Sequence, residues 1–185
     1  MRPAQFQLSK NILIKPYERS DEDRFMEMSV DQAVIQYMSG ANGDEWEERQ
    51  LFQKIFAIYD RTENVPFFYI WGIYQNEQLV GHVELKETEH TSEKELEIVY
   101  MLHPDARRKG IMKTVLLFFQ NNQFFFDRQI IATVHTDNEA SLKLLKKWGY
   151  ARKTYYIEDS TKYIKIWLKK RVSTGLFGLP NYWSI

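Results

Sequence analysis

Apolar positions along the chain recur at two spacings, about 2 residues and about 3.6 residues, which are the repeats of strands and helices. In the N-terminal third the pattern predicts one strand and then two helices. The strand covers residues 11–16, a short helix runs over about residues 20–30, and a longer helix starts at Asp44. The longer helix is expected to bury one face, made of Leu51, Ile55, Ile58 and Tyr59.

The middle of the chain predicts three successive antiparallel strands. Residues 67–74 (FFYIWGIY) are nearly all aromatic or β-branched, and residues 79–86 and 95–103 follow after polar turns. A helix over about 110–123 comes next, with Ile111, Val115, Phe118 and Phe119 directed inward. The chain then predicts a strand at 129–135, a helix at 138–148 that stops at Gly149, and strands at 151–157 and 163–168. This order indicates a mixed α/β sheet.

The final segment, residues 171–185, is apolar but rich in glycine and proline, which predicts an irregular tail. We therefore expect one domain over residues 1–170, followed by this tail. Its large apolar side chains would be costly to leave in water. The tail is expected to pack either on the domain or on a partner, and a homodimer is one such arrangement.

Composition narrows the function classes. The 25 basic and 25 acidic residues balance, whereas a nucleic-acid-binding domain usually carries a basic excess. The absence of cysteine rules out disulfides, cysteine-ligated metals and a cysteine nucleophile. No segment approaches the roughly 20 apolar residues of a membrane span, and the N-terminus lacks a signal-peptide core. The sequence thus predicts a cytoplasmic protein that binds neither nucleic acid nor membrane.

A basic turn between a strand and a helix carries the strongest chemical signal. Arg107, Arg108 and Lys109 precede Gly110, where the helix is expected to open. The first N–H groups of a helix lack intrahelical partners and lie at the positive end of its dipole, so an anion such as phosphate is stabilised there. An ordinary solvated turn would have the same composition. The turn is neither a P-loop nor a dinucleotide fingerprint.

Two segments together resemble the GNAT N-acetyltransferases. Residues 107–112 (RRKGIM) are similar to the family's motif A, Gln/Arg-x-x-Gly-x-Gly/Ala, except for Met112 at the last position. Residues 138–150 (NEASLKLLKKWGY) are similar to the family's second motif, Asn-x-x-Ser/Ala…Lys-x-Gly-Phe/Tyr. The resemblance covers about residues 10–170. Its details look closest to the branch that acetylates the N-termini of ribosomal proteins.

This resemblance implies a fold, a reaction and a binding site. The GNAT fold is a mixed, mostly antiparallel sheet of about six or seven strands, splayed centrally and flanked by about four helices. The reaction is acetyl transfer from acetyl-CoA, without a metal, to the amine of a small molecule or a protein N-terminus by direct attack. A CoA-binding regulatory module with little turnover is the alternative. The implied cofactor-binding residues are Met101, Leu102, His103, Arg107, Arg108, Lys109, Gly110, Ile111, Met112, Lys113, Asn138 and Ser141.

Catalytic roles follow from the same resemblance. Glu97 is the leading general base, acting directly or through a water, and a solvent-facing glutamate is the other interpretation. The tyrosine that many relatives use to protonate the departing thiolate is replaced by Leu145. Ser141 could hydrogen-bond the sulfur instead, or could serve only as a capping or packing residue. His82 and His135 are secondary candidates, expected to be mainly structural.

The sequence says little about the acceptor. Glu84, Glu87 and Glu89 form an acidic series that could attract a cationic amine, although exposed hairpin carboxylates are the more common explanation.

Overall fold

The computed structural model describes residues 2–38, 43–61, 67–122 and 128–169, apart from the side chains of residues 150 and 151. The tail expected at 171–185 and the loop expected around 40–42 lie outside these ranges. The described chain holds eight strands and five α-helices. In order, the elements are β1 (Phe6–Ser9), β2 (Ile12–Lys15), η1 (Arg19–Asp21), α1 (Glu22–Ser29), α2 (Gln32–Ile35), α3 (Glu45–Tyr59), β3 (Phe68–Gln75), β4 (Gln78–Lys86), β5 (Glu95–Leu102), η2 (Pro104–Ala106), α4 (Ile111–Asn121), β6 (Gln129–His135), α5 (Glu139–Trp148), β7 (Tyr150–Glu158) and β8 (Thr161–Leu168).

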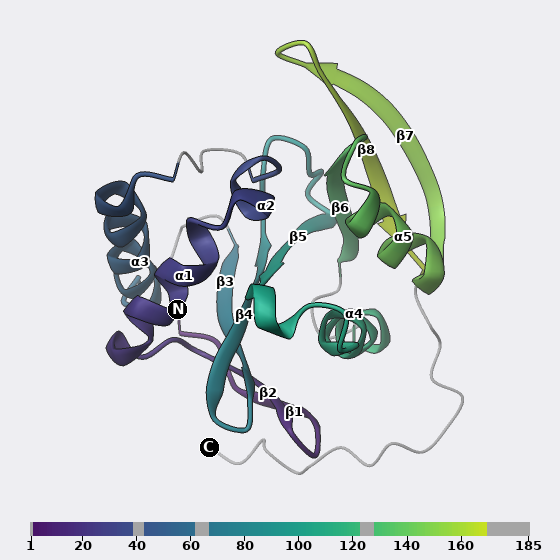
Figure 1. The fold of residues 1–185 in the computed structure, drawn as a ribbon. Helices are drawn as coiled ribbons and strands as arrows, with labels where there is room; N and C mark the ends of the chain where they lie inside the picture. The colour runs from purple at the N-terminus through teal and green to yellow at the C-terminus, as the bar shows by residue number, and fades with distance from the viewer. Residues whose placement is uncertain (1, 39–42, 62–66, 123–127, 170–185) are drawn as a thin grey trace.

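All eight strands form one sheet, in the order β1-β2-β3-β4-β5-β6-β8-β7. Helices cover both faces: α1 and α3 lie on one side of the sheet, and α4 and α5 lie on the other (Figure 1). Each face has its own core. One core buries apolar side chains of α1, α2 and α3 against β3, β4 and β5. The other buries those of α4 and α5 against strands from β2 to β8. The sheet therefore separates two packed layers.

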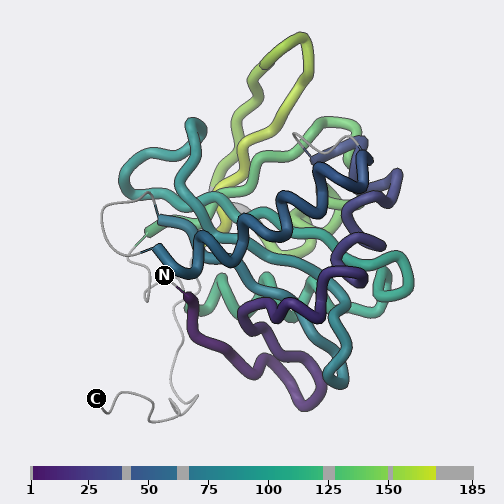
Figure 2. The backbone as a smooth tube through the Cα atoms, turned by 90° about the vertical axis from the view of Figure 1, so that its left-hand side faces the viewer, coloured from purple at the N-terminus to yellow at the C-terminus, as the bar shows by residue number. Residues whose placement is uncertain are grey.

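The sheet opens at its centre, between β5 and β6. These are its only parallel neighbours among the described strands, and they pair only from Glu95↔Gln129 to Glu97↔Ile131. Beyond Glu97, β5 continues to pair with β4, and beyond Ile131, β6 continues to pair with β8. The facing edges of β5 and β6 thus separate after three residue pairs. The β7–β8 hairpin projects beyond the body of the molecule on the β6 side of this opening (Figures 1 and 2).

Most predicted elements are confirmed, including the central splay and the mostly antiparallel pairing. Strand β1 was not anticipated, because its residues Phe6–Ser9 form only a short, partly exposed edge. The face predicted for α3 was partly wrong: Leu51 is exposed, and Phe52 is fully buried in its place. An N-cap at Asp44, whose side chain accepts from the Glu47 N–H, fixes where this helix begins.

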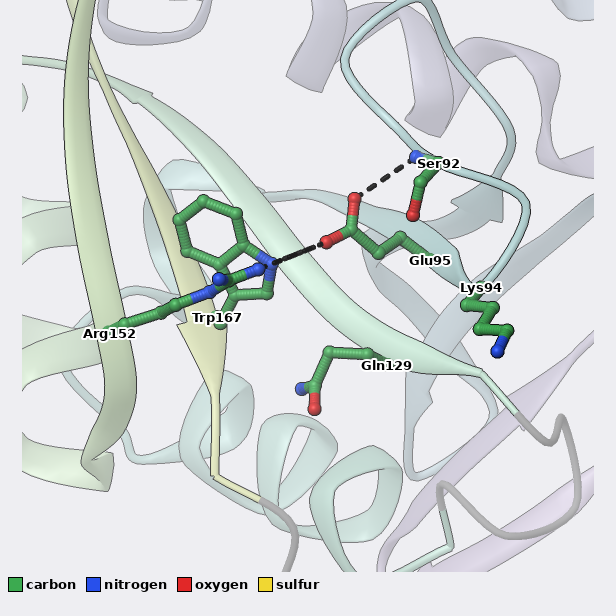
Figure 3. Close-up of a pocket in the computed structure, with 6 residues that line it drawn as sticks. All are labelled: Ser92, Lys94, Glu95, Gln129, Arg152 and Trp167. Carbon is green, nitrogen blue, oxygen red and sulfur yellow. Dashed lines mark hydrogen bonds and ion pairs between the residues drawn. The ribbon is translucent and has the colours of Figure 1, made fainter.

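A buried carboxylate fastens the loop before β5 to β8. Glu95 accepts hydrogen bonds from Lys165 Nζ at 2.9 Å, from the Ser92 N–H at 3.0 Å, and from the Trp167 indole. These contacts line a hollow of about 380 Å³, where Arg152 lies over the Trp167 ring (Figure 3). Burial acts to raise the pKa of Glu95, but the hydrogen bonds from Lys165, Trp167 and Ser92 lower it to about 2. The carboxylate is satisfied by the protein itself, so the hollow has a structural role.

Replacing Glu95 by Gln is expected to lower the free energy of unfolding by about 2–3 kcal/mol at pH 7, since one acceptor oxygen and the negative charge that faces Lys165 and Trp167 are lost. A carboxyl whose pKa is depressed on folding stabilises above its unfolded pKa and loses that contribution as pH falls through its folded pKa. The difference between variant and wild type should therefore shrink between about pH 4.5 and about pH 2. Urea unfolding at pH 7 and pH 3 measures it. Glu93→Gln, on the exposed part of the same loop, should change stability by less than about 0.5 kcal/mol at either pH.

Candidate functional site

A cleft of about 1000 Å³ occupies the opening between β5 and β6. Its walls are residues 97–102 of β5 and residues 132–135 of β6. One end reaches the basic turn and the first residues of α4, and the other reaches the loop after β4 and the β7–β8 hairpin. Residues of α2 and α5 also line it. The cleft therefore joins the predicted phosphate site to the region next to Glu97.

The basic turn ends in a left-handed glycine that opens α4. Gly110 is the N-cap, with φ 78° and ψ 3°. The first i→i−4 bond of the helix runs from the Thr114 N–H to the Gly110 carbonyl, so the N–H groups of Ile111, Met112 and Lys113 precede it. A Cβ on Gly110 would meet no atom within 4 Å. The helix start thus borders the cleft with open space beside Gly110 and with N–H groups that have no i−4 partner, which suits a bound anion.

The three basic residues of the turn have different surroundings. Arg107 forms an ion pair with Asp31, the N-cap of α2, and its Nε donates to the Leu102 carbonyl at 3.3 Å. Arg107 therefore anchors the turn, although it also borders the cleft. Arg108 and Lys109 are exposed, and Arg108 has a left-handed φ of 62°. Of these two, only Arg108 lines the cleft.

The helix side of this end is formed by α4 and the last turn of α5. Met112, the departure from the motif, has a side chain that is buried in the α4 core, so its main chain is what lies at the helix start. Lys113 is exposed and holds its ammonium 5.1 Å from the centre of the Trp148 ring, and both residues line the cleft. The buried Trp148 Nε1 donor has no hydrogen-bond partner within the described ranges.

Along β5, Met101 and Leu102 line the cleft and His103 does not. The His103 N–H donates to the Val80 carbonyl, and its carbonyl accepts from the Ala106 N–H. Its imidazole is 3.0 Å from a Glu27 oxygen. The main chain and side chain of His103 thus hold η2 in place, and the main-chain edge that faces the cleft comes from the residues before it.

Glu97 lies where the two strands separate. It is only 7% exposed, it lines the cleft, and its Oε2 accepts a hydrogen bond from Thr88 Oγ1 at 2.7 Å. Side chains alternate along a strand. Leu96 and Ile98 pack in the core with α4 and α5, so Glu97 is on the other face, with α1–α3. The interpretation of Glu97 as a solvent-facing residue is wrong, because its carboxylate is buried.

The first turn of α5 borders the other face of the opening. Asn138 caps the helix, and its Oδ1 accepts from the Ser141 N–H at 3.1 Å. The Tyr100 hydroxyl of β5 donates to Ser141 Oγ at 3.3 Å. Asn138, Ser141 and Tyr100 all line the cleft. Leu145, where many relatives have a tyrosine, is fully buried in the core.

Acidic and aromatic residues surround the opposite end of the cleft. His90 Nε2 lies 3.6 Å from Glu89 and 3.5 Å from Glu158, and these are the described residues whose ligand atoms converge as a metal site would require. Tyr156 stacks on Tyr163 with ring centres 5.5 Å apart. Burial raises the pKa of Tyr156 to about 12, helped by the nearby carboxylates of Glu97 and Glu158 and opposed by Thr133. Carboxylates beside aromatic faces favour a cationic guest.

The other acidic and histidine candidates have structural partners. His82 is buried between the Tyr17 hydroxyl, at 2.9 Å, and Glu84 Oε1, at 3.0 Å. The expectation that Glu84 is an exposed hairpin carboxylate is wrong, because its side chain is largely buried. Its burial acts to raise the pKa, but His82 and Lys86 lower it to about 2. Glu87 pairs with Arg128, and His135 accepts from the Asp137 N–H while its ring packs on Tyr163.

No sequence motif points to a role for Tyr100, Tyr156 or Trp148, although all three line the cleft. Tyr100 stands three residues before the predicted end of its strand, and strand alternation alone places it on the face opposite Glu97. Its partner on α5 depends on how helix and strand pack, and no motif carries that information. Tyr156 reaches the cleft because β7 pairs with β8, which in turn pairs with β6.

Comparisons with known proteins agree with this fold. A family model described as an acetyltransferase (GNAT) domain matches residues 11–151. One similar structure is RimL, a ribosomal L7/L12 α-N-protein acetyltransferase, in complex with coenzyme A. It superposes with a TM-score of 0.66 at 12% identity, over 90% of this chain and 99% of that one. Another is a spermidine N-acetyltransferase (SpeG) mutant from Vibrio cholerae. It superposes with a TM-score of 0.65 at 16% identity, over 86% of this chain and 94% of that one.

The Salmonella typhimurium acetyltransferase that modifies the N-terminal serine of ribosomal protein L7/L12 superposes with a TM-score of 0.68, at 14% identity, over 91% of this chain and all of that one. At these identities the structural likeness shows the fold. No curated protein sequence matches the chain significantly. Within the described ranges, no helix is long and apolar enough to cross a bilayer.

Proposed function

Because the chain belongs to the GNAT family of acetyl-CoA-dependent N-acetyltransferases, we propose that it transfers an acetyl group to a primary amine by direct attack within a ternary complex. The observation that carries this proposal is the opening between β5 and β6. It is a cleft through the sheet, with Glu97 on one face and Ser141 on the other. A thioester lying in it would have a base on its acyl side and a hydroxyl donor on its sulfur side.

Acetyl-CoA fits the groups that border the cleft. The N–H groups at the start of α4, with Arg108 beside them, would hold the pyrophosphate. Main-chain groups of residues 98–102, left without a β6 partner, would pair with the amides of the pantetheine arm. Asn138 and the Trp148 indole lie along the same wall. Bound there, acetyl-CoA supplies the activated acyl group.

The acceptor would enter at the end bordered by Glu89, Glu158 and Tyr156, where negative charge favours a protonated amine. Attack requires the neutral amine, and Glu97 would take the proton. An α-amino group has a pKa of about 7.7–8.0 and a lysine side chain about 10.4. At neutral pH an N-terminal amine therefore loses its proton to the base more easily than a lysine does. The similar structures include enzymes for a protein N-terminus and one for a polyamine, and we propose that the acceptor is a primary amine of this class.

Acetyl-CoA should raise the melting temperature of the protein, because a ligand that binds only the folded state stabilises it. A panel of N-terminal peptides, polyamines and lysine peptides should then release free CoA thiol with at least one acceptor class. Desulfo-CoA, which keeps the pyrophosphate, is the matched ligand and should stabilise without turnover. Stabilisation with no thiol release across the panel would favour the CoA-binding module. No stabilisation at millimolar acetyl-CoA would reject both.

A further inference from the structure

Tyr100 and Ser141 form a hydrogen-bonded pair across the cleft, between β5 and α5. Tyr100 is on the face of β5 that packs against α4 and α5, opposite Glu97. Its hydroxyl donates to Ser141 Oγ at 3.3 Å, and both residues line the cleft. The pair therefore lies on the sulfur side of a thioester whose acyl carbon faces Glu97.

The hydrogen-bonding capacity of Ser141 leaves its own proton available. A serine hydroxyl has one donor and two acceptor positions. The Tyr100 hydroxyl takes one acceptor position, while Asn138 fixes the serine main chain through the Ser141 N–H. Oγ is thus located from two directions, and its O–H can be donated to a third group in the cleft. Burial raises the pKa of Tyr100 to about 12, opposed by the bond to Ser141, so the phenol remains a donor at any pH near neutral.

We propose that Tyr100 is a positioning residue that orients the Ser141 hydroxyl toward the departing sulfur of acetyl-CoA. This inference rests on the proposed function. It gives the chain a phenol near the sulfur even though the second motif has Leu145, which is buried in the core. The phenol comes from β5 instead and acts through the serine.

The electron balance needs no further reactant. The amine nitrogen bonds to the acyl carbon, the C–S bond breaks, and the sulfur takes the electron pair. Glu97 receives the proton that the amine loses. The sulfur leaves as a thiolate that accepts a hydrogen bond from Ser141, and it is protonated by solvent after release. A thiol has a pKa of about 8.5, so a hydrogen bond is sufficient help at neutral pH. No proton crosses from Tyr100 to Ser141.

The pair can be tested without turnover, by titrating the thiol of bound CoA through the ultraviolet absorbance of its thiolate. In the wild-type complex, the thiol pKa should be about one unit below that in the Ser141→Ala complex, the equivalent of one hydrogen bond. Tyr100→Phe should raise it by about half a unit, and adding Tyr100→Phe to Ser141→Ala should change it no further. Tyr155→Phe, which removes an exposed phenol on β7, is the control.

Steady-state kinetics give the second readout. Tyr100→Phe should lower kcat about fivefold, with the KM for acetyl-CoA within twofold, and the deficit should be the same from pH 6 to pH 9. Equal thiol pKa values in wild type, Tyr100→Phe and Ser141→Ala would overturn the proposal, even if the enzyme turns over. A shifted thiol pKa in a protein that acetylates no acceptor would support the pair and contradict the proposed function.

Discussion

Gly110→Val is expected to weaken acetyl-CoA binding about a hundredfold. Gly110 has φ 78° at the N-cap of α4, and a β-branched residue there costs about 1–2 kcal/mol or distorts the turn. Gly110 also lines the cleft, so the added side chain would take up space beside the helix start, where we propose that the pyrophosphate lies. Losing one charge-assisted hydrogen bond there adds about 1.5–3 kcal/mol. Calorimetric titration with acetyl-CoA measures the change in Kd.

Two further variants separate the effect of the left-handed backbone conformation from the effect of the added side-chain volume. Asparagine tolerates the left-handed region, so Gly110→Asn should bind acetyl-CoA more tightly than Gly110→Val. Gly43→Ala adds a side chain at a second glycine with φ 78°, before α3, and should lower stability without changing the Kd. Because no protein atom lies near the new Cβ at position 110 and asparagine tolerates the left-handed region, the melting temperature of free Gly110→Asn should fall less than that of Gly110→Val. Unchanged acetyl-CoA affinity in Gly110→Val would place the pyrophosphate elsewhere.

The candidate anion site could be proposed from the sequence because its determinants are local. A strand end, a basic turn and a glycine before a helical repeat are contiguous. The unpaired N–H groups and the dipole of a helix N-terminus then favour an anion at that point. The structure matches this expectation at Gly110, which adopts the left-handed conformation and starts α4. The splay of β5 and β6 came from the family resemblance, and the register of three paired residues confirms it.

What the sequence could not provide was the partner of each polar side chain. The resemblance implies that Arg107 binds the cofactor, but it could not reveal that the Arg107 guanidinium also holds the turn to Asp31, the N-cap of α2. Glu84 and Glu97 have the same side chain and lie on adjacent strands. Glu84 is neutralised by His82 and Lys86, whereas Glu97 borders the cleft beside Thr88. Composition and periodicity do not reveal which partners a glutamate has, because long-range packing determines them.

Glu97→Gln is expected to lower kcat/KM at pH 7 by about a hundredfold or more, the usual contribution of a general base. The substitution keeps the shape of the side chain and an oxygen that can accept the Thr88 hydrogen bond, so the fold and acetyl-CoA affinity should be unchanged. The deficit should narrow as pH rises through the pKa of the acceptor amine, about 7.7–8.0 for an N-terminus, because more amine is then already neutral. Rates of thiol release from pH 6.5 to pH 9.5 measure this.

Two control variants show whether the loss of activity is specific to the Glu97 carboxylate. Glu93→Gln removes a carboxylate from the exposed part of the preceding loop and should retain full activity. Thr88→Val removes the hydrogen bond to Glu97 but keeps its carboxylate, so its loss should be smaller, about fivefold. If Glu97→Gln loses activity equally at every pH, the glutamate orients the acceptor rather than removing its proton. If it loses none, the base must be sought at the acidic end of the cleft, where Glu89, His90 and Glu158 converge.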